Sequence, residues 1–224
     1  MPSVVPTGQL VDRPADITYV LDQLAAGALD LPAQFGGEPD LDRVGHTGHS
    51  FGAYTSHAVG GATFDTPGSE VFADERIDAI GPISPQGQGQ MGAFDRGPTD
   101  NTWASVTIPA YNLIGGEEMD TNAVSTVDEP GWRMTPFLRY PAEGDKFVTV
   151  LDGQDHADMW ATGDDAVLAY IAEQLLAFFA HYVAGDESVD ACAIGADPGP
   201  DVSIDVTTDR LASTTRSSIS DCGD

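Results

Sequence analysis

Apolar positions along the chain fall into short runs and longer helical stripes, the pattern of strands separated by helices. Four short runs predict buried strands, at 42–47, 76–83, 106–114 and 147–151. Three longer stripes predict helices, at 15–29, 53–60 and 165–182. Strands that alternate with helices or long crossovers favour a parallel sheet. The sequence therefore predicts an α/β fold with a mostly parallel sheet.

The composition changes at about residue 184, where Asp, Ser, Thr and Gly replace large apolar residues. We therefore divide the chain into a core, 1–183, and an acidic C-terminal tail, 184–224, which should lie on the surface as a separate segment or be partly disordered. Cys192 and Cys222 both lie in the tail. A disulfide between them would close a loop of about 31 residues. The alternative is two inert thiols in a reducing compartment.

The net charge is −27, from 36 acidic and nine basic residues, and Lys146 is the only lysine. Nucleic acids and anionic membranes are excluded as partners, because binding them requires clustered Arg and Lys. Repulsion at this charge would strain a compact fold in dilute buffer, whereas about 1 M salt screens it within about 3 Å. We expect a protein from a high-salt environment. The alternative is an ordinary acidic protein whose charge serves solubility.

The sequence also limits the cellular location. No apolar run approaches the roughly 20 residues that cross a bilayer. The first ten residues lack a basic region followed by an apolar core, the pattern of a secretory signal. We expect a soluble protein, and both cytoplasmic and secreted locations stay open.

The most informative motif is the pentapeptide Gly-x-Ser-x-Gly at 48–52. It lies between a predicted strand and a predicted small-residue helix, where a serine hydrolase places its nucleophile on a sharp turn. Ser50 would project above the sheet edge, and the backbone N–H of Phe51 would point toward a developing oxyanion. The alternative is a glycine-flanked turn with an incidental serine.

Four segments, in order along the chain, carry a resemblance to a known family. They are Arg13-Pro14-Ala15-Asp16, the run GHSFGAY at 48–54, Ile83-Ser84-Pro85-Gln86-Gly87 and Leu151-Asp152-Gly153-Gln154-Asp155-His156. Together they resemble the dienelactone-hydrolase and platelet-activating-factor-acetylhydrolase-like branch of the α/β-hydrolases, which neighbours the cutinases and polyester hydrolases. The resemblance implies a triad of serine, acid and histidine that acts on esters. A C-terminal disulfide also occurs in related cutinases.

The base of such a triad must be one of five histidines. His156 is favoured because it follows the last predicted core strand, where a loop overhangs the nucleophile. The acid should follow the strand at 106–114. Where the family typically has Gly-Thr-x-Asp, this chain has Glu118 at the Asp position, and Asp120 is the competing candidate. Four histidines are expected to be structural, namely His46, His49, His57 and His181.

The resemblance begins almost at the first predicted helix, so roughly the first third of the usual hydrolase fold has no counterpart here. We therefore expect a shortened α/β-hydrolase without the N-terminal strands. The absent part usually supplies a second oxyanion N–H, whose loss costs about 3 kcal/mol. A natural minimal form, completion by a neighbouring subunit and an incomplete sequence all stay open. An exposed strand edge on that flank favours a homodimer.

Other candidate ligands have weaker support. Three acidic residues near His156 match no zinc spacing, so neither a metal nor a cofactor is expected; they are Asp152, Asp155 and Asp158. The segment 86–92 is expected to rim the substrate cleft with amide side chains. Three tryptophans are candidates for an apolar pocket, with core packing expected for at least two; they are Trp103, Trp132 and Trp160.

These observations predict a serine hydrolase that cleaves carboxylic esters through an acyl-enzyme. Short-chain esters are the expected substrates, and polyesters such as PET are further candidates. The competing hypothesis is a non-catalytic, hydrolase-like subunit that acts in binding or assembly.

Overall fold

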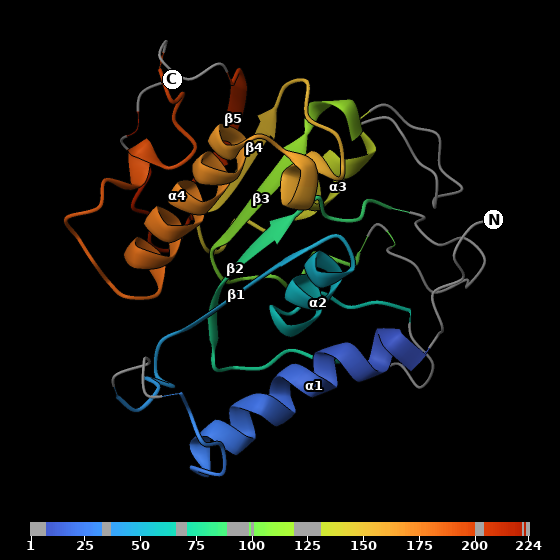
Figure 1. Cartoon of the computed structure of the whole chain (residues 1–224), viewed down its shortest axis with the longest axis vertical. Helices are drawn as coiled ribbons and strands as arrows, with labels where there is room; N and C mark the ends of the chain where they lie inside the picture. The colour runs from blue at the N-terminus through green and yellow to red at the C-terminus, as the bar shows by residue number, and fades with distance from the viewer. Residues whose placement is uncertain are drawn as a thin grey trace.

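The computed structural model describes residues 8–32, 37–65, 71–88, 99, 101–118, 131–199, 204–220 and 222. Within these residues the chain forms a mixed α/β fold around a five-stranded sheet (Figure 1). The strands are β1 (Val44–His49), β2 (Ile77–Ile83), β3 (Ala110–Gly115), β4 (Lys146–Leu151) and β5 (Val206–Leu211). The α-helices are α1 (Gly8–Ala25), α2 (Phe51–Val59), α3 (Thr135–Arg139) and α4 (Asp165–Tyr182). Shorter helical turns are η3 (Gly116–Glu118), η4 (Trp132–Met134), η5 (Asp158–Thr162) and η6 (Ala191–Ala193).

The order of strands in the sheet follows the chain, β1-β2-β3-β4-β5. The first four strands are parallel, and β5 runs antiparallel to β4, so the predicted α/β class with a mostly parallel sheet is confirmed. Parallel strands bring their carboxyl ends to one edge of a sheet. The segments that follow β1, β2, β3 and β4 therefore lie in a row along that edge.

Helices cover both faces of the sheet (Figure 1). Helix α4 packs on one face, while α1 and α2 pack on the other. Two glycines let α4 approach closely, since a Cβ at Gly81 would lie 2.6 Å from Leu175 and one at Gly45 would lie 2.6 Å from Phe179. The sheet is thus covered on both sides, as its apolar strands require. No helix in the described part of the chain is long and apolar enough to cross a membrane.

Helix α1 begins at Gly8 and contains Pro14, although the sequence predicted a helix that starts after this proline. Proline lacks the N–H that would bond the carbonyl of the fourth residue before it. That carbonyl belongs to Leu10, and it accepts a 2.6 Å hydrogen bond from the Tyr54 hydroxyl of α2. A side chain of the packing helix therefore replaces the missing backbone bond, and α1 continues through the proline.

The described part of the C-terminal tail belongs to the sheet and the core. Strand β5 pairs with β4 from Leu151↔Val206 to Lys146↔Leu211. Three isoleucines of the tail are buried, namely Ile194, Ile204 and Ile219. The expectation of a separate surface segment missed this strand, because alternate β5 positions are exposed and polar.

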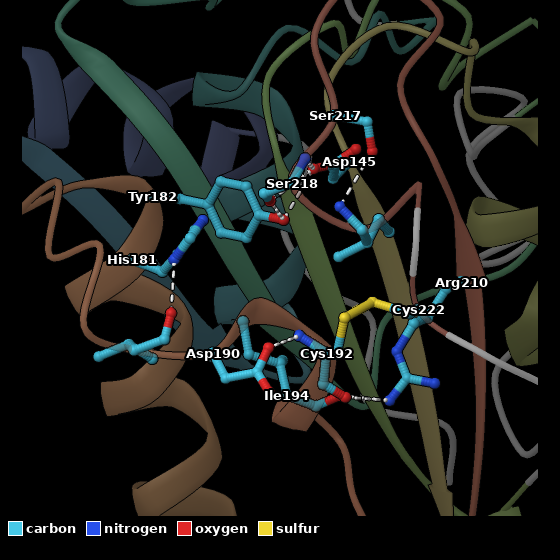
Figure 2. Close-up of a disulfide and its surroundings, with 12 residues drawn as sticks. Asp145, His181, Tyr182, Asp190, Cys192, Ile194, Arg210, Ser217, Ser218 and Cys222 are labelled. Atoms are coloured by element: carbon cyan, nitrogen blue, oxygen red, sulfur yellow. Dashed lines mark hydrogen bonds between the residues drawn. A yellow bond between two sulfur atoms is a disulfide. The ribbon is translucent and has the colours of Figure 1, made fainter.

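Two contacts fasten the tail (Figure 2). Cys192 and Cys222 form a disulfide with Cα atoms 5.4 Å apart, so the bonded alternative is confirmed. The buried carboxylate of Asp145, just before β4, accepts hydrogen bonds from the Ser218 N–H and the Tyr182 hydroxyl. The disulfide between Cys192 and Cys222 stabilises the fold by about 4 kcal/mol in the chain-entropy model.

Strand β1 pairs only with β2 among the described residues, which leaves its other edge open. The Ser50 N–H donates to Ile83 O beside β1, and backbone groups alternate in direction along a strand. The N–H and C=O groups of Gly45, Thr47 and His49 therefore face the open edge. A groove of about 580 Å³ lies there, lined in part by residues of α1.

We predict that this open edge makes the protein a homodimer, because unpaired strand groups favour association. Thr47→Pro removes an outward N–H and keeps the backbone bonds of the β1–β2 ladder, losing only the hydrogen bond from Thr47 Oγ1 to Gly81 O that Thr47→Val also loses, so it should shift dimer toward monomer. Sedimentation at micromolar concentration in about 2 M KCl measures the shift. Thr47→Val keeps the N–H and should remain dimeric, whereas a strictly monomeric wild-type protein would contradict the prediction.

Candidate active site

Ser50 lies on the turn between β1 and α2, as the sequence predicted. Its backbone has φ 56° and ψ −114°, and such conformations cost a non-glycine residue about 1 to 3 kcal/mol. A Cβ at Gly48 would lie 2.6 Å from the Gly52 backbone, whereas a Cβ at Gly52 would meet nothing within 4 Å. The tight turn therefore requires the first glycine of the pentapeptide for steric reasons, and not the second.

His156 follows β4 and lies beside Ser50. Its Nε2 is 2.9 Å from Ser50 Oγ, and its Nδ1 is 2.6 Å from Glu118 Oε2. The imidazole is partly open to solvent, with 42% of its side chain exposed, whereas the Glu118 side chain is 2% exposed. The structure thus brings the predicted serine, histidine and glutamate into one hydrogen-bonded chain. Asp120, the competing acid, lies outside the described residues.

Two glycines, the last residue of β3 and the first of η3, place Glu118 next to His156. A Cβ at Gly115 would lie 2.4 Å from Gln154 O, and one at Gly116 would lie 3.1 Å from Asp152 Cα. The segment after β3 therefore packs tightly against the segment that leads from β4 to His156. This close approach holds the buried carboxylate under the imidazole.

Both oxygens of Glu118 have partners. Oε1 accepts hydrogen bonds from the Ser84 hydroxyl at 2.5 Å and the Gly115 N–H at 3.0 Å. Oε2 contacts His156 and lies 3.0 Å from Arg133 Nε, an ion pair without hydrogen-bond alignment. Burial alone would raise the pKa of Glu118, but these four contacts together hold its pKa below the ordinary value. The acid is therefore ionised at neutral pH.

Arg133 is a site residue that sequence reasoning missed. It belongs to η4, and its side chain is 8% exposed. One nitrogen, Nη1, donates to Ser84 O and Pro85 O, and Nη2 lies 3.3 Å from His156 Nδ1. No local sequence pattern marks it, because its partners belong to segments far away in the chain.

Ser84 and Gln86 follow β2, in one of the four segments of the family resemblance. Ser84 is buried with φ 49°, so the chain turns sharply here as it does at Ser50. Gln86 is 3% exposed, and its side-chain N–H donates to Ser50 O at 2.6 Å. The expectation that Gln86 rims the cleft is wrong, because its amide is buried and holds the serine turn.

The other four histidines lie apart from the proton path between Ser50 and Glu118. Burial lowers the pKa of His46 to about 4 and that of His57 to about 3. His49 Nε2 contacts His156 O at 2.9 Å, and burial is the main cause that lowers its pKa. His181, near the end of α4, contacts Val189 O. None of the four contacts the Ser50 hydroxyl in the described structure.

The Phe51 N–H lies in the first turn of α2, where backbone N–H groups have no intrahelical acceptor. It is therefore available to an oxyanion formed at Ser50. Within the described residues we assign no second donor.

Trp160 lies near this site with 66% of its surface exposed, while Trp103 and Trp132 are buried. Its ring is stacked with that of His49, at a centroid distance of 6.2 Å. It is thus the tryptophan that is free to line a substrate site.

The described residues contain no group of three or more His, Cys, Asp and Glu side chains that could hold a metal ion. Asp155, one of the acids near His156, instead accepts hydrogen bonds from the backbone N–H groups of Ala157 and Asp158. Its carboxylate therefore serves to start η5.

Comparison of the chain with protein-family models and with curated proteins finds no significant match. The chemistry of the site must be inferred from its geometry. A hydroxyl, an imidazole and a buried carboxylate in hydrogen-bonded sequence can transfer the hydroxyl proton to the imidazole as the oxygen attacks an electrophile.

We predict that Glu118→Gln reduces turnover of a p-nitrophenyl ester by about 10³- to 10⁴-fold, because a neutral amide does not hold the imidazole in the productive tautomer. Steady-state kinetics measure the loss. Asp120→Asn and Glu117→Gln make the same charge change nearby and should have mild effects. A larger loss in Asp120→Asn would assign the acid to Asp120.

Proposed function

We propose that the protein is a serine hydrolase that cleaves carboxylic esters through an acyl-enzyme. The observation that carries this proposal is the hydrogen-bonded chain from Ser50 through His156 to the buried Glu118. A serine hydroxyl becomes a strong nucleophile when an adjacent base takes its proton and a third group orients that base. The strained turn between β1 and α2 supports the same proposal, since it presents the hydroxyl at the carboxyl edge of the sheet.

In this mechanism His156 takes the Ser50 proton as the oxygen attacks the ester carbonyl. The Phe51 N–H donates to the resulting oxyanion. His156 then gives the proton to the leaving alcohol, and the acyl group stays on Ser50. His156 next takes a proton from water, which attacks the acyl carbonyl, and returns it to the serine as the acid leaves. Glu118 stays ionised and stabilises the imidazolium at each step.

The contacts of the four resembling segments support assignment to a shortened α/β-hydrolase. The serine turn, the Ser84 segment and the His156 segment all follow parallel strands at the same sheet edge. The first segment reaches the site through Arg13, whose guanidinium lies 4.9 Å over the Phe51 ring. Segments scattered along the chain thus meet around one serine, which favours a shared function for them.

The surroundings of Ser50 support esters with an apolar or aromatic group. The exposed ring of Trp160 and the ring of His49 line the part of the β1-edge groove that lies beside the serine turn, so the predicted dimer contact must leave this part open. Aromatic side chains of this kind offer flat apolar contact area. Short-chain esters are our first choice, and the open groove also suits a polyester such as PET.

A non-catalytic binding or assembly subunit is the second candidate. It is favoured by one observation, that Phe51 supplies the single oxyanion donor we assign within the described residues. Removing one such donor typically reduces turnover by about 10²- to 10³-fold.

We predict that a fluorophosphonate probe labels Ser50 in a one-to-one ratio, because the base makes this hydroxyl nucleophilic. Mass spectrometry of the labelled peptide checks the site. Ser188→Ala, at an exposed serine, should label like the wild type, whereas Ser50→Ala should not label. Ser50→Ala and His156→Ala should each lower hydrolysis of p-nitrophenyl butyrate by at least about 10³-fold. Labelling of Ser50→Ala at the wild-type rate would refute the proposal, and labelling without turnover would favour the second candidate.

Within the described residues, the structure keeps the imbalance of charge at the surface as large as the composition suggests, because two acidic residues, Glu118 and Asp145, are buried along with two basic ones. Arg133 and Lys146, two of the nine basic residues, are buried. The ammonium of Lys146 donates to Ile108 O and Gly144 O. The exposed residues thus keep the full excess of acids over bases, which supports our proposal of a high-salt environment.

We predict that the melting temperature and ester turnover both rise between about 0.1 M and about 2 M KCl, because salt screens the carboxylate repulsion. Calorimetry and a rate assay across this range measure them. Lowering the pH toward the isoelectric point of about 4.1 should also relieve repulsion but should stop turnover, because hydrolysis requires an unprotonated imidazole as the base. If the melting temperature and the turnover both stay constant across this salt range, the high-salt proposal is contradicted, whereas the hydrolase proposal is unaffected.

A further inference from the structure

The guanidinium of Arg133 touches the segments that follow three different strands. It donates to Ser84 O and Pro85 O after β2, lies 3.0 Å from the Glu118 carboxylate after β3, and lies 3.3 Å from His156 Nδ1 after β4. The planar group also packs 5.1 Å from the Trp132 ring. A residue in the short turn η4 thus links three of the four segments that build the site.

A buried permanent charge is costly unless opposite charge and acceptors surround it. Here the carboxylate supplies the charge, and the two carbonyls accept from Nη1. An arginine fits this place because its fork contacts all three segments at once, which the single ammonium of a lysine cannot do. The contacts restrict where Glu118 can lie and therefore where it can hold the imidazole.

His156 Nδ1 has two competing neighbours. Glu118 Oε2 lies 2.6 Å away and can only accept, while Arg133 Nη2 lies 3.3 Å away and can only donate. The shorter contact keeps the proton on Nδ1 and leaves Nε2 free to accept from Ser50. The guanidinium thus places a permanent positive charge beside the ring. Within the described residues, other titratable neighbours are the half-buried His49 ring, 4.5 Å away, and the exposed Asp155, whose carboxylate accepts from the Ala157 and Asp158 N–H groups.

We infer that Arg133 is a positioning residue that orients Glu118 against His156 and extends ester turnover to lower pH. This inference rests on the proposed hydrolase function. Arg133 acts through the acid and the base, and we assign it no contact with the substrate.

The test compares two Arg133 variants and one control over about pH 5 to 9, with kcat and KM for p-nitrophenyl butyrate. Arg133→Gln removes the charge, so the acid limb of kcat/KM should move up by about one pH unit or more. Arg133→Lys keeps the charge but loses the fork, so the acid limb should stay while kcat falls about 10- to 100-fold at constant KM. Arg139→Gln removes one charge from the exposed end of α3 and should change neither the acid limb of kcat/KM nor kcat. An unmoved acid limb in a folded Arg133→Gln protein would overturn the inference.

A second measurement does not depend on ester turnover. In the Ser50→Ala protein, the NMR titration midpoint of His156 should be higher when Arg133→Gln is added. An unchanged midpoint would overturn the inference, even if the protein proved not to be a hydrolase. If Arg133→Gln fails to fold, Arg133→Lys decides, because wild-type kcat in that variant would exclude a positioning role. If the wild-type protein has no esterase activity, the proposed function is wrong. The NMR titration of His156 then still tests the role of Arg133.

Discussion

An almost fully buried carboxylate must stay ionised at the centre of this site, and the surrounding structure depends on meeting that requirement. Glu118 has 2% of its side chain exposed, and burial by itself favours the neutral acid. A hydroxyl from the segment after β2, a backbone N–H from the end of β3, an imidazole from the segment after β4 and a guanidinium from η4 converge on it. Parallel strands in chain order make this convergence possible, since they bring the carboxyl ends of successive strands to one edge.

Local backbone strain and tight packing accompany the same arrangement. Ser50 and Ser84 both adopt positive φ values at the ends of neighbouring strands, which costs each of them about 1 to 3 kcal/mol. The buried Gln86 amide fastens the first turn, and the Glu118 contact fastens the second. Strained residues held by several neighbours in this way are common at functional sites, where the strain presents a reactive group in a fixed direction.

Much of the fold was predictable from local sequence signals. Helix α4 was predicted with its observed bounds, because its apolar residues recur at helical spacing. Strand β5 was missed, because it lies at a sheet edge and contains Asp209 and Arg210. The start of α1 was misplaced, since Pro14 is tolerated only through a hydroxyl from another helix.

The site residues also fall into those that the sequence predicts and one that it does not. Ser50 carries a motif, and His156 and Glu118 follow predicted strands, so their proximity follows from a parallel sheet. Arg133 has no such signal, because its role depends on three segments that are distant in sequence. The open edge of β1 could be expected from the sequence, because no strand is predicted before 42–47.

Rapid-quench mass spectrometry during turnover of p-nitrophenyl butyrate tests the central claim most directly. If Ser50 is the nucleophile of an acyl-enzyme, the peptide that contains it should gain the mass of one butyryl group before steady state, and the adduct should disappear as butyrate forms. The adduct should be absent in His156→Ala. Turnover without an acylated peptide, or an acyl group on another residue, would contradict the account.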